Sequence, residues 1–141
     1  MSPRLPAGEK PPILIAEGEA DALYDLALRW RRRHPHSAPL LLEELERART
    51  VPEHELPADV VTMGSHVVFR DRMGGAEHTV QLVYPASADM AQQRISVLTP
   101  IGAGLIGMRR GRSIAWPNRL GEPRWLEIVA VIQPGPRECA A

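Results

Sequence analysis

The sequence lacks the features that would tie it to a membrane or to an oxidising compartment. Its one cysteine, Cys139, stands near the C-terminus, so no disulfide can form within the chain. It has no apolar run long enough to cross a membrane, and its opening, "MSPRLPAGEKPP", has no apolar core of a secretory signal. We therefore expect a cytoplasmic protein with no membrane partner.

An excess of charge of one sign is also missing. The chain has 17 basic and 17 acidic residues, a formal net charge of zero and only 4% aromatic residues. Nucleic-acid-binding proteins usually show a clear basic excess, and single-strand binders stack bases on aromatic rings. We expect no direct sequence-specific binding of nucleic acid. The chain does have 44% hydrophobic residues over 141 positions, which is enough to bury the core of one domain with an appendage.

Prolines crowd the start of the chain, and a helical pattern follows them. Prolines at positions 3, 6, 11 and 12 predict an irregular leader over residues 1–16. Apolar residues then recur at the spacing of one helical face, at Leu23, Leu26, Ala27 and Trp30. This first helix would have roughly 17 residues. A second apolar pattern at 40–50 follows the short segment "HPHSAP". Residues 17–50 are therefore predicted to form an antiparallel helical hairpin, a short coiled coil.

The second half of the chain has the period of strands. After a proline-containing linker at 51–59, apolar residues alternate with polar ones in five segments: 66–70, 78–84, 94–98, 113–116 and 125–132. The last segment is apolar on both faces, which predicts an interior strand. "MGG" at 73–75 predicts a hairpin turn, and residues 86–93 predict a polar loop. The fold class is thus α+β, with a second domain over 60–134 and a tail over 135–141.

One motif, "IGAGLIG", matches the GxGxxG spacing of a dinucleotide-binding turn. That site needs a strand, the glycine turn and a long crossover helix before the next strand. Here the next predicted strand begins near Ser113, which leaves no room for such a helix. The alternative is a short helix, capped by Thr99 and Pro100 and ended by Gly111, whose glycines let it lie close on a sheet. No cofactor is expected.

The segment around this motif resembles a family signature. "ISVLTPIGAGLIGMRRGRSIAW" at 95–116 is similar to the C-terminal domain of the GreA/GreB family of transcription factors. Segments 56–71 and 80–89 resemble, more narrowly, the members of this family that have a short helical arm. Gly104 departs from the pattern, since the family usually has alanine there. The signature positions are Thr99, Pro100, Ile101, Gly102, Leu105, Ile106, Gly107 and Gly111.

The resemblance implies both a fold and a partner. It implies an FKBP-like domain, in which an antiparallel sheet wraps around one short helix, and binding to RNA polymerase near its secondary channel with the hairpin pointing inward. The short-armed members bind polymerase without a long coiled coil. An FKBP-like fold does not by itself bring prolyl isomerase activity. We expect a monomer that is not an enzyme, although an FKBP-like binding or isomerase module stays an alternative.

The tip of the hairpin decides whether the family's cleavage chemistry is expected. Family members that stimulate transcript cleavage carry an acid pair there, which holds Mg²⁺. Here the tip is "WRRRHPHSAP", and the nearest acids are Glu43 and Glu44. Side chains of adjacent helical residues point about 100° apart and do not converge on one ion. We expect these two acids on a solvated face near the start of the second helix.

The sequence therefore predicts a regulator that binds polymerase, competes with longer-armed factors and does not stimulate cleavage. An active cleavage factor is the alternative. Two histidines without a third ligand make a weak metal signal, so no metal is expected. The arginines could meet acidic groups or phosphate in the channel, or they could be a solvated helix end. The candidate partner-binding residues are Arg31, Arg32, Arg33, His34 and His36.

Overall fold

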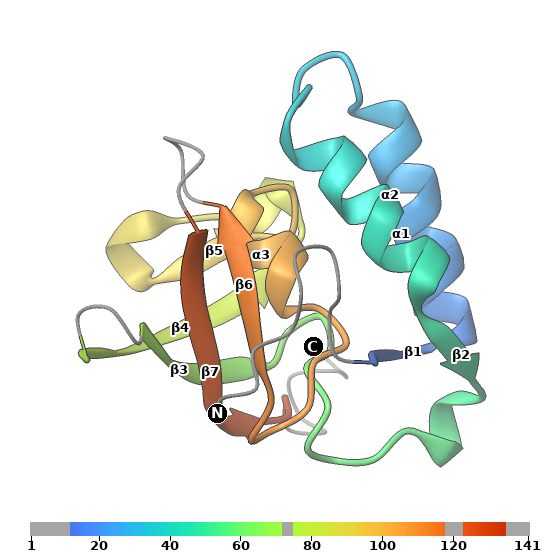
Figure 1. The fold of residues 1–141 in the computed structure, drawn as a ribbon. Helices are drawn as coiled ribbons and strands as arrows, with labels where there is room; N and C mark the ends of the chain where they lie inside the picture. The colour runs from blue at the N-terminus through green and yellow to red at the C-terminus, as the bar shows by residue number, and fades with distance from the viewer. Residues whose placement is uncertain (1–11, 72–74, 118–122, 135–141) are drawn as a thin grey trace.

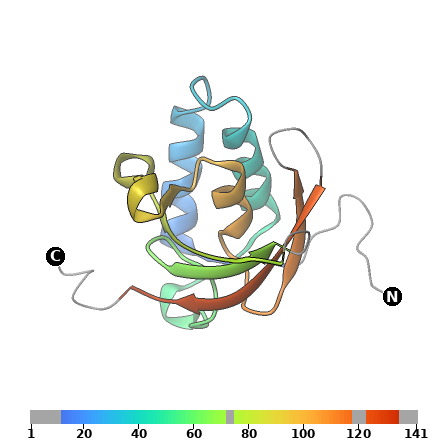
Figure 2. The ribbon, with the colours of Figure 1, turned by 90° about the vertical axis from the view of Figure 1, so that its left-hand side faces the viewer.

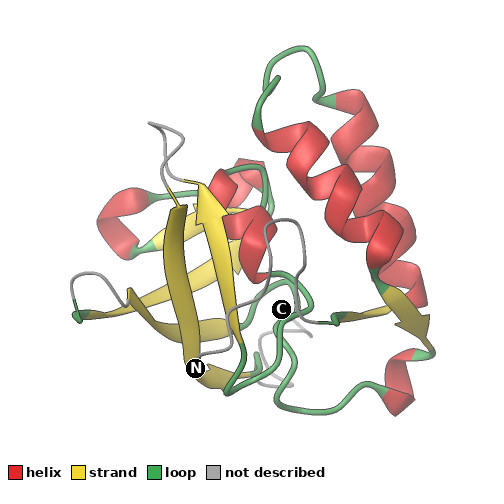
Figure 3. Ribbon diagram, in the orientation of Figure 1, coloured by secondary structure: helices red, strands yellow, loops and turns green. Residues whose placement is uncertain are grey.

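The structure, a computed structural model, describes residues 12–71, 75–117 and 123–134 and confirms a mixed α+β protein (Figure 1 and Figure 3). Short 3-10 turns lie at Glu53–Glu55, Pro85–Ser87 and Met90–Gln92. The helices and strands are, in chain order, β1 (Leu14–Ala16), α1 (Glu17–Arg29), α2 (Ser37–Arg47), β2 (Arg49–Val51), β3 (His66–Asp71), β4 (Glu77–Val83), β5 (Arg94–Ser96), α3 (Pro100–Leu105), β6 (Ser113–Pro117) and β7 (Pro123–Ile132).

Helices α1 and α2 lie side by side and form the arm, with the connecting loop 30–36 at its tip (Figure 1). Helix α1 is 13 residues long, so it ends earlier than predicted. Its end is set by the carbonyl of Trp30, which accepts hydrogen bonds from the amides of both Arg33 and His34. Pro35 then disfavours helical geometry in the residue before it. Helix α2 begins at Ser37, ahead of the predicted residue 40, because a proline in a first helical turn loses no hydrogen bond.

The predicted irregular leader is wrong at its inner end, and the second helix, predicted to reach residue 50, ends at Arg47. Residues 14–16 form β1, which pairs in parallel with β2 at 49–51. The prolines stop at Pro12, and the apolar residues after them, Ile13 and Ile15, are both only 1% exposed. Burial of these two side chains, each worth about 1.5–3 kcal/mol, orders a segment that its composition did not mark as a strand. Residues 1–11 of the predicted leader and 135–141 of the predicted tail lie outside the described residues.

The main sheet has five strands in the order β5-β4-β3-β7-β6. The expected hairpin joins β3 to β4 in antiparallel pairing, although Met73 and Gly74 of its turn lie outside the described residues. β7 is an interior strand, as its two apolar faces predicted. The expectation of a wholly antiparallel sheet is wrong for β4 and β5, which are parallel. Between the two strands, residues 84–93 contain two turns of 3-10 helix. These turns bring the chain back so that Arg94 lies beside Gln81, and β5 then runs in the same direction as β4.

Helix α3 is held close to the chain that precedes it. The hydroxyl of Thr99 accepts a hydrogen bond from the amide of Gly102 at 3.0 Å, so the predicted N-cap is confirmed. A Cβ on Gly102 would meet the carbonyl oxygen of Ser96 and the Cα of Val97. The predicted end at Gly111 is wrong, because the helix stops at Leu105 and the chain turns at Gly107 with a φ of +79°. Gly111 lies in the turn before β6 instead.

The arm and the sheet share one hydrophobic core. Figure 2 shows α1, α2 and α3 on the same side of the curved sheet. Leu23 of α1 and Leu41 of α2 belong to the same buried cluster as Val67 of β3 and Ile128 of β7. Ala27, near the end of α1, and Ala38, at the start of α2, belong to the cluster too, so the arm packs on the domain along much of its length. Within the described ranges, every helix is too short or too polar to traverse a lipid bilayer.

Replacing Gly102 with alanine should destabilise the protein, because its Cβ would collide with backbone atoms that cannot rotate away. We expect Gly102→Ala to lower the free energy of unfolding by about 2 kcal/mol or more, measured by urea denaturation. The matched control is Gly18→Ala in α1, where an added Cβ meets nothing within 4 Å. That change should raise stability by up to about 1 kcal/mol. Equal stability of the two variants would contradict the close approach at Gly102.

Candidate functional site

The tip of the arm presents the predicted arginines beyond the end of α1. Arg31, Arg32, Arg33 and His36 are exposed, and His34 is half-buried. The guanidinium carbon of Arg33 lies 5.5 Å from the centre of the Trp30 ring, within cation–π range. The His34 ring is also 5.5 Å from that of Trp30. The tip is thus a small basic surface built around one tryptophan, with its charges in a turn rather than in the last helical turn.

The two glutamates nearest the tip have different environments. Glu43 is exposed on α2, as predicted. Glu44 is fully buried, so the expectation that it lies on a solvated face is wrong. Its carboxylate accepts two hydrogen bonds from the guanidinium of Arg47, at 2.8 and 3.1 Å, on the next turn of the helix. A buried carboxylate needs such a partner, and one held this way is not available to coordinate an ion in solution.

Among the described residues, no three side chains of the histidine, cysteine, aspartate and glutamate types come together as metal ligands. His34 packs against Trp30, while His36 immediately precedes α2 without capping it through its side chain. The two histidines therefore belong to the basic surface of the tip.

The base of the arm carries a polar contact that the sequence did not suggest. The carboxylate of Glu19, in the first turn of α1, accepts a hydrogen bond from the amide of Met63 at 3.1 Å. Burial of this carboxyl raises its pKa, the bond from Met63 opposes the rise, and the nearby charge of Glu53 adds to it. The phenol of Tyr84 also has a raised pKa, first because of burial and second because of the Glu19 charge. The bond to Met63 joins the arm to the loop before β3, and Tyr84, directly after β4, is near enough for the Glu19 charge to affect its pKa.

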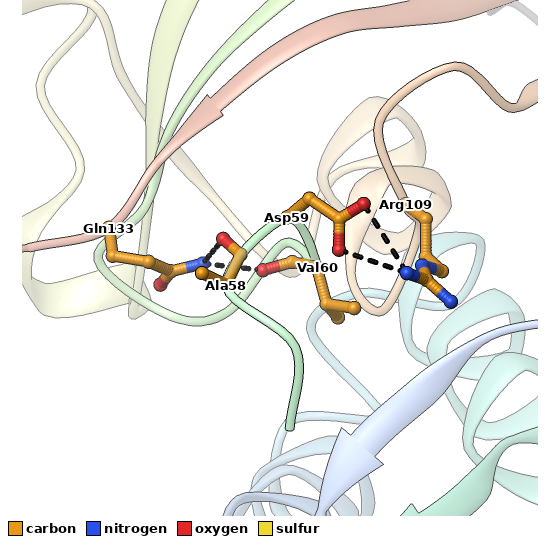
Figure 4. Close-up of polar contacts among 5 residues, drawn as sticks. All are labelled: Ala58, Asp59, Val60, Arg109 and Gln133. Atoms are coloured by element: carbon orange, nitrogen blue, oxygen red, sulfur yellow. Dashed lines mark hydrogen bonds and ion pairs between the residues drawn. The ribbon is translucent and has the colours of Figure 1, made fainter. Parts of the chain in front are cut away.

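The loop before β3 is held in place by the side chain of Gln133, which directly follows β7 (Figure 4). The amide nitrogen of Gln133 donates to the carbonyls of Ala58 and Val60, at 2.9 and 2.7 Å. Its amide oxygen accepts from the hydroxyls of Thr62 and Ser65, at 2.8 and 3.1 Å. One glutamine side chain thus satisfies four polar groups, each a net gain of about 0.5–1.5 kcal/mol.

Arg109 has a structural partner near the same loop. Its guanidinium lies 3.3 Å from the carboxylate of Asp59, and both side chains are about 40% exposed (40% and 39%). An ion pair this open to solvent contributes little, up to about 1 kcal/mol. The amide of Arg110 also donates to the carbonyl of Asp59. Arg110 and Arg112, in the segment before β6, are exposed.

Sequence reasoning missed Glu19, Glu44 and Gln133 because their partners or their burial depend on distant parts of the fold. Glu19 was read only as one of the acids that are common at the start of a helix. Its hydrogen bond comes from Met63, 44 residues away in the sequence. Gln133 bonds Ala58 across 75 residues. The one local signal was at Glu44, where an arginine three positions later predicts an ion pair along the helix.

With this geometry in view, the comparisons identify the family. The model of the GreA/GreB transcription elongation factor C-terminal region matches residues 56–133, more than half of the chain. The chain belongs to this family. The regulator of nucleoside diphosphate kinase (Rnk) of Escherichia coli strain K12 is 41% identical over 92 residues, which are 65% of this chain and 68% of that protein. This similarity confirms the narrower resemblance within the family, which is to Rnk.

Elongation factors themselves are also similar. Transcription elongation factor GreA of Acidiphilium cryptum is 33% identical over 135 residues, which are 90% of this chain and 85% of that protein. The solved structure of a GreA/GreB elongation factor from Nitrosomonas europaea has a TM-score of 0.68 and 36% identity, and the match covers 87% of this chain and 99% of that one. The similarity in structure thus extends over both the arm and the sheet.

Neutralising Glu19 should change how stability depends on pH. A carboxyl whose pKa is raised in the folded state binds protons more tightly there, so stability falls as pH rises from the ordinary value of 4.5 through the raised pKa. Glu19→Gln removes this fall in stability, because glutamine does not ionise, and it keeps an oxygen that accepts the hydrogen bond from the Met63 amide. We expect the variant to be more stable than the parent at pH 7, with the difference shrinking at acidic pH, measured by thermal unfolding at several pH values. Glu43→Gln, exposed on α2, controls for net charge, and an equal effect of both changes would contradict the role of burial.

Proposed function

We propose that this protein is a non-enzymatic RNA polymerase-binding regulator of transcription of the Rnk type. It acts at the secondary channel of polymerase in the cytoplasm, as a monomer, and does not stimulate transcript cleavage. It competes there with longer-armed factors of the GreA/GreB family. Its domain of five strands and α3 is FKBP-like and docks on the polymerase, while the arm occupies the channel entrance.

The observation that carries this proposal is the basic tip on a short arm within a GreA/GreB protein. Helix α1 has 13 residues, about 20 Å at the usual rise per residue. The tip carries Arg31, Arg32 and Arg33 and no carboxylate between positions 30 and 42. A cation-binding acid pair is thus replaced by positive charges, which suit acidic side chains or phosphate groups.

The buried state of Glu44 supports the absence of cleavage activity. A second Mg²⁺ at the polymerase site needs carboxylate oxygens that reach it from the tip. Glu44 is covered and bonded to Arg47, and Glu43 alone cannot supply a pair. Occlusion of the channel by a bound arm requires no such ligands.

The absence of cleavage is tested on stalled elongation complexes. We expect no shortening of the nascent transcript when the protein is added, under conditions in which a GreA factor shortens it. Glu43→Gln should leave this result unchanged, because the residue has no role in the proposed mechanism. Transcript shortening that disappears in Glu43→Gln would establish the protein as a cleavage factor and overturn the proposal.

Binding is tested against core RNA polymerase, with a GreA factor as competitor. Reversing Arg31, Arg32 and Arg33 to glutamate should weaken affinity by about tenfold or more, because attraction at the channel becomes repulsion. The matched control reverses three exposed arginines elsewhere, Arg49, Arg110 and Arg112, with the same change of net charge. Unchanged affinity in the tip variant would remove the tip from the interface. Failure to bind polymerase, together with measurable prolyl isomerisation, would favour an FKBP-like enzyme.

A further inference from the structure

The base of the arm is closed by the two short strands that flank it. β1 leads into α1, β2 follows α2, and the two strands pair from Leu14 with Arg49 to Ala16 with Val51. The amide of Arg49 also donates to the carbonyl of Ile13 at 3.0 Å. Figure 1 shows this pair at the end of the arm opposite the tip. The start of α1 and the end of α2 are thereby held next to each other.

β1 is attached to the sheet domain through Gly107. The amide of Leu14 donates to the carbonyl of Gly107 at 3.1 Å, and the amide of Gly107 donates to the carbonyl of Val61 at 3.0 Å. A Cβ on Gly107 would lie 3.0 Å from the Cβ of Ile13 and 3.1 Å from the carbonyl oxygen of Leu14. The strand therefore passes so close to this residue that an added Cβ would fit only if the strand moved by a few tenths of an ångström.

Two further features join the same region. The side chains of Ile13 and Ile15 enter the core that the arm and sheet share. One turn into α1, Glu19 accepts the hydrogen bond from Met63. Backbone, apolar and charged contacts thus all fix the base of the arm within a few residues of β1. The exposed arginines follow Trp30, which packs against the same core, and Arg33 lies over its ring, so their position follows that of the arm.

We propose that residues 13–16 are a clasp that sets the direction of the arm, and that Gly107 is the positioning residue that lets the clasp close. The proposal rests on the proposed function, because the direction of the arm matters when the tip must meet a partner in a channel. In this proposal Gly107 of the GxGxxG motif has a specific structural role. The residue permits close passage of the N-terminal strand, in addition to the turn that its positive φ allows.

The first test compares two glycines with the same backbone conformation. Gly107 and Gly111 have φ angles of +79° and +88°, but an added Cβ meets nothing within 4 Å at Gly111. Both alanine variants carry the same conformational strain, and only Gly107→Ala obstructs β1. We expect hydrogen exchange at the amides of Leu14 and Arg49 to be about tenfold faster or more in Gly107→Ala than in Gly111→Ala. Equal exchange in both variants would overturn the clasp.

The second test uses apolar contacts and remains informative if Gly107→Ala does not fold. Ile13 of the clasp and Ile128 of β7 are each 1% exposed, so their alanine variants remove the same side chain from the same core. Ile13→Ala should speed exchange at Leu14 and Arg49 more than at the amides of β3, and Ile128→Ala should not show this preference. The reverse pattern, or no difference, would overturn the proposal.

A binding measurement connects the clasp to the arm. In the Ile13→Ala background, the loss of polymerase affinity caused by reversing Arg31, Arg32 and Arg33 should be smaller by about threefold or more, since a released arm no longer presents its tip. In the Ile128→Ala background that loss should stay as in the parent. Equal losses would show that the clasp does not position the tip. If the parent fails to bind polymerase, the proposed function fails, while the exchange results still decide the clasp.

Discussion

The fold depends on backbone segments that pass each other at contact distance around α3. On one side the chain before the helix lies against Gly102, and on the other β1 lies against Gly107. Packing this close is possible only without side chains, and it puts the arm, the short helix and the sheet into one core. Two glycines of the motif that spells a nucleotide-binding turn, Gly102 and Gly107, are thus explained by the close approach of neighbouring backbone.

Much of the fold followed from local patterns, and the errors have a common cause. The alternation in 66–70 and 125–132 marked strands correctly, and Thr99 marked the start of a helix, because these signals act within a few residues. The parallel pair β1–β2 was missed because a strand of three residues carries almost no period. The end of α1 was missed because backbone hydrogen bonds to the carbonyl of Trp30 make the turn that ends the helix. The arginines that follow Trp30 in the sequence give no signal for such a turn.

The candidate site, too, was predictable only where the signal is local. The basic character of the tip was readable from the sequence, since three consecutive arginines remain basic in any fold. The contacts at the base of the arm were not, because Glu19 and Gln133 bond backbone groups that only the folded chain brings near. At Glu44 the partner is local but the burial was missed. Glutamate is usually exposed, and here Arg47, one turn further along the helix, supplies the charged partner that a buried carboxylate needs.

Backbone hydrogen bonds fix β1 and β2 at the base of the arm, whereas Arg31, Arg32 and Arg33 at the tip are exposed, so the two ends of the hairpin are open to different degrees of evolutionary change. Whole helical turns can be gained or lost at the tip without disturbing β1, β2 or the residues around Gly107. About seven residues added to each helix, two turns, would return the apolar stripe to the same side. A lineage could thereby lengthen or shorten its reach into a partner while the sheet domain stays the same. Arm length, and with it the group delivered at the tip, is the part of this architecture that is easiest to vary.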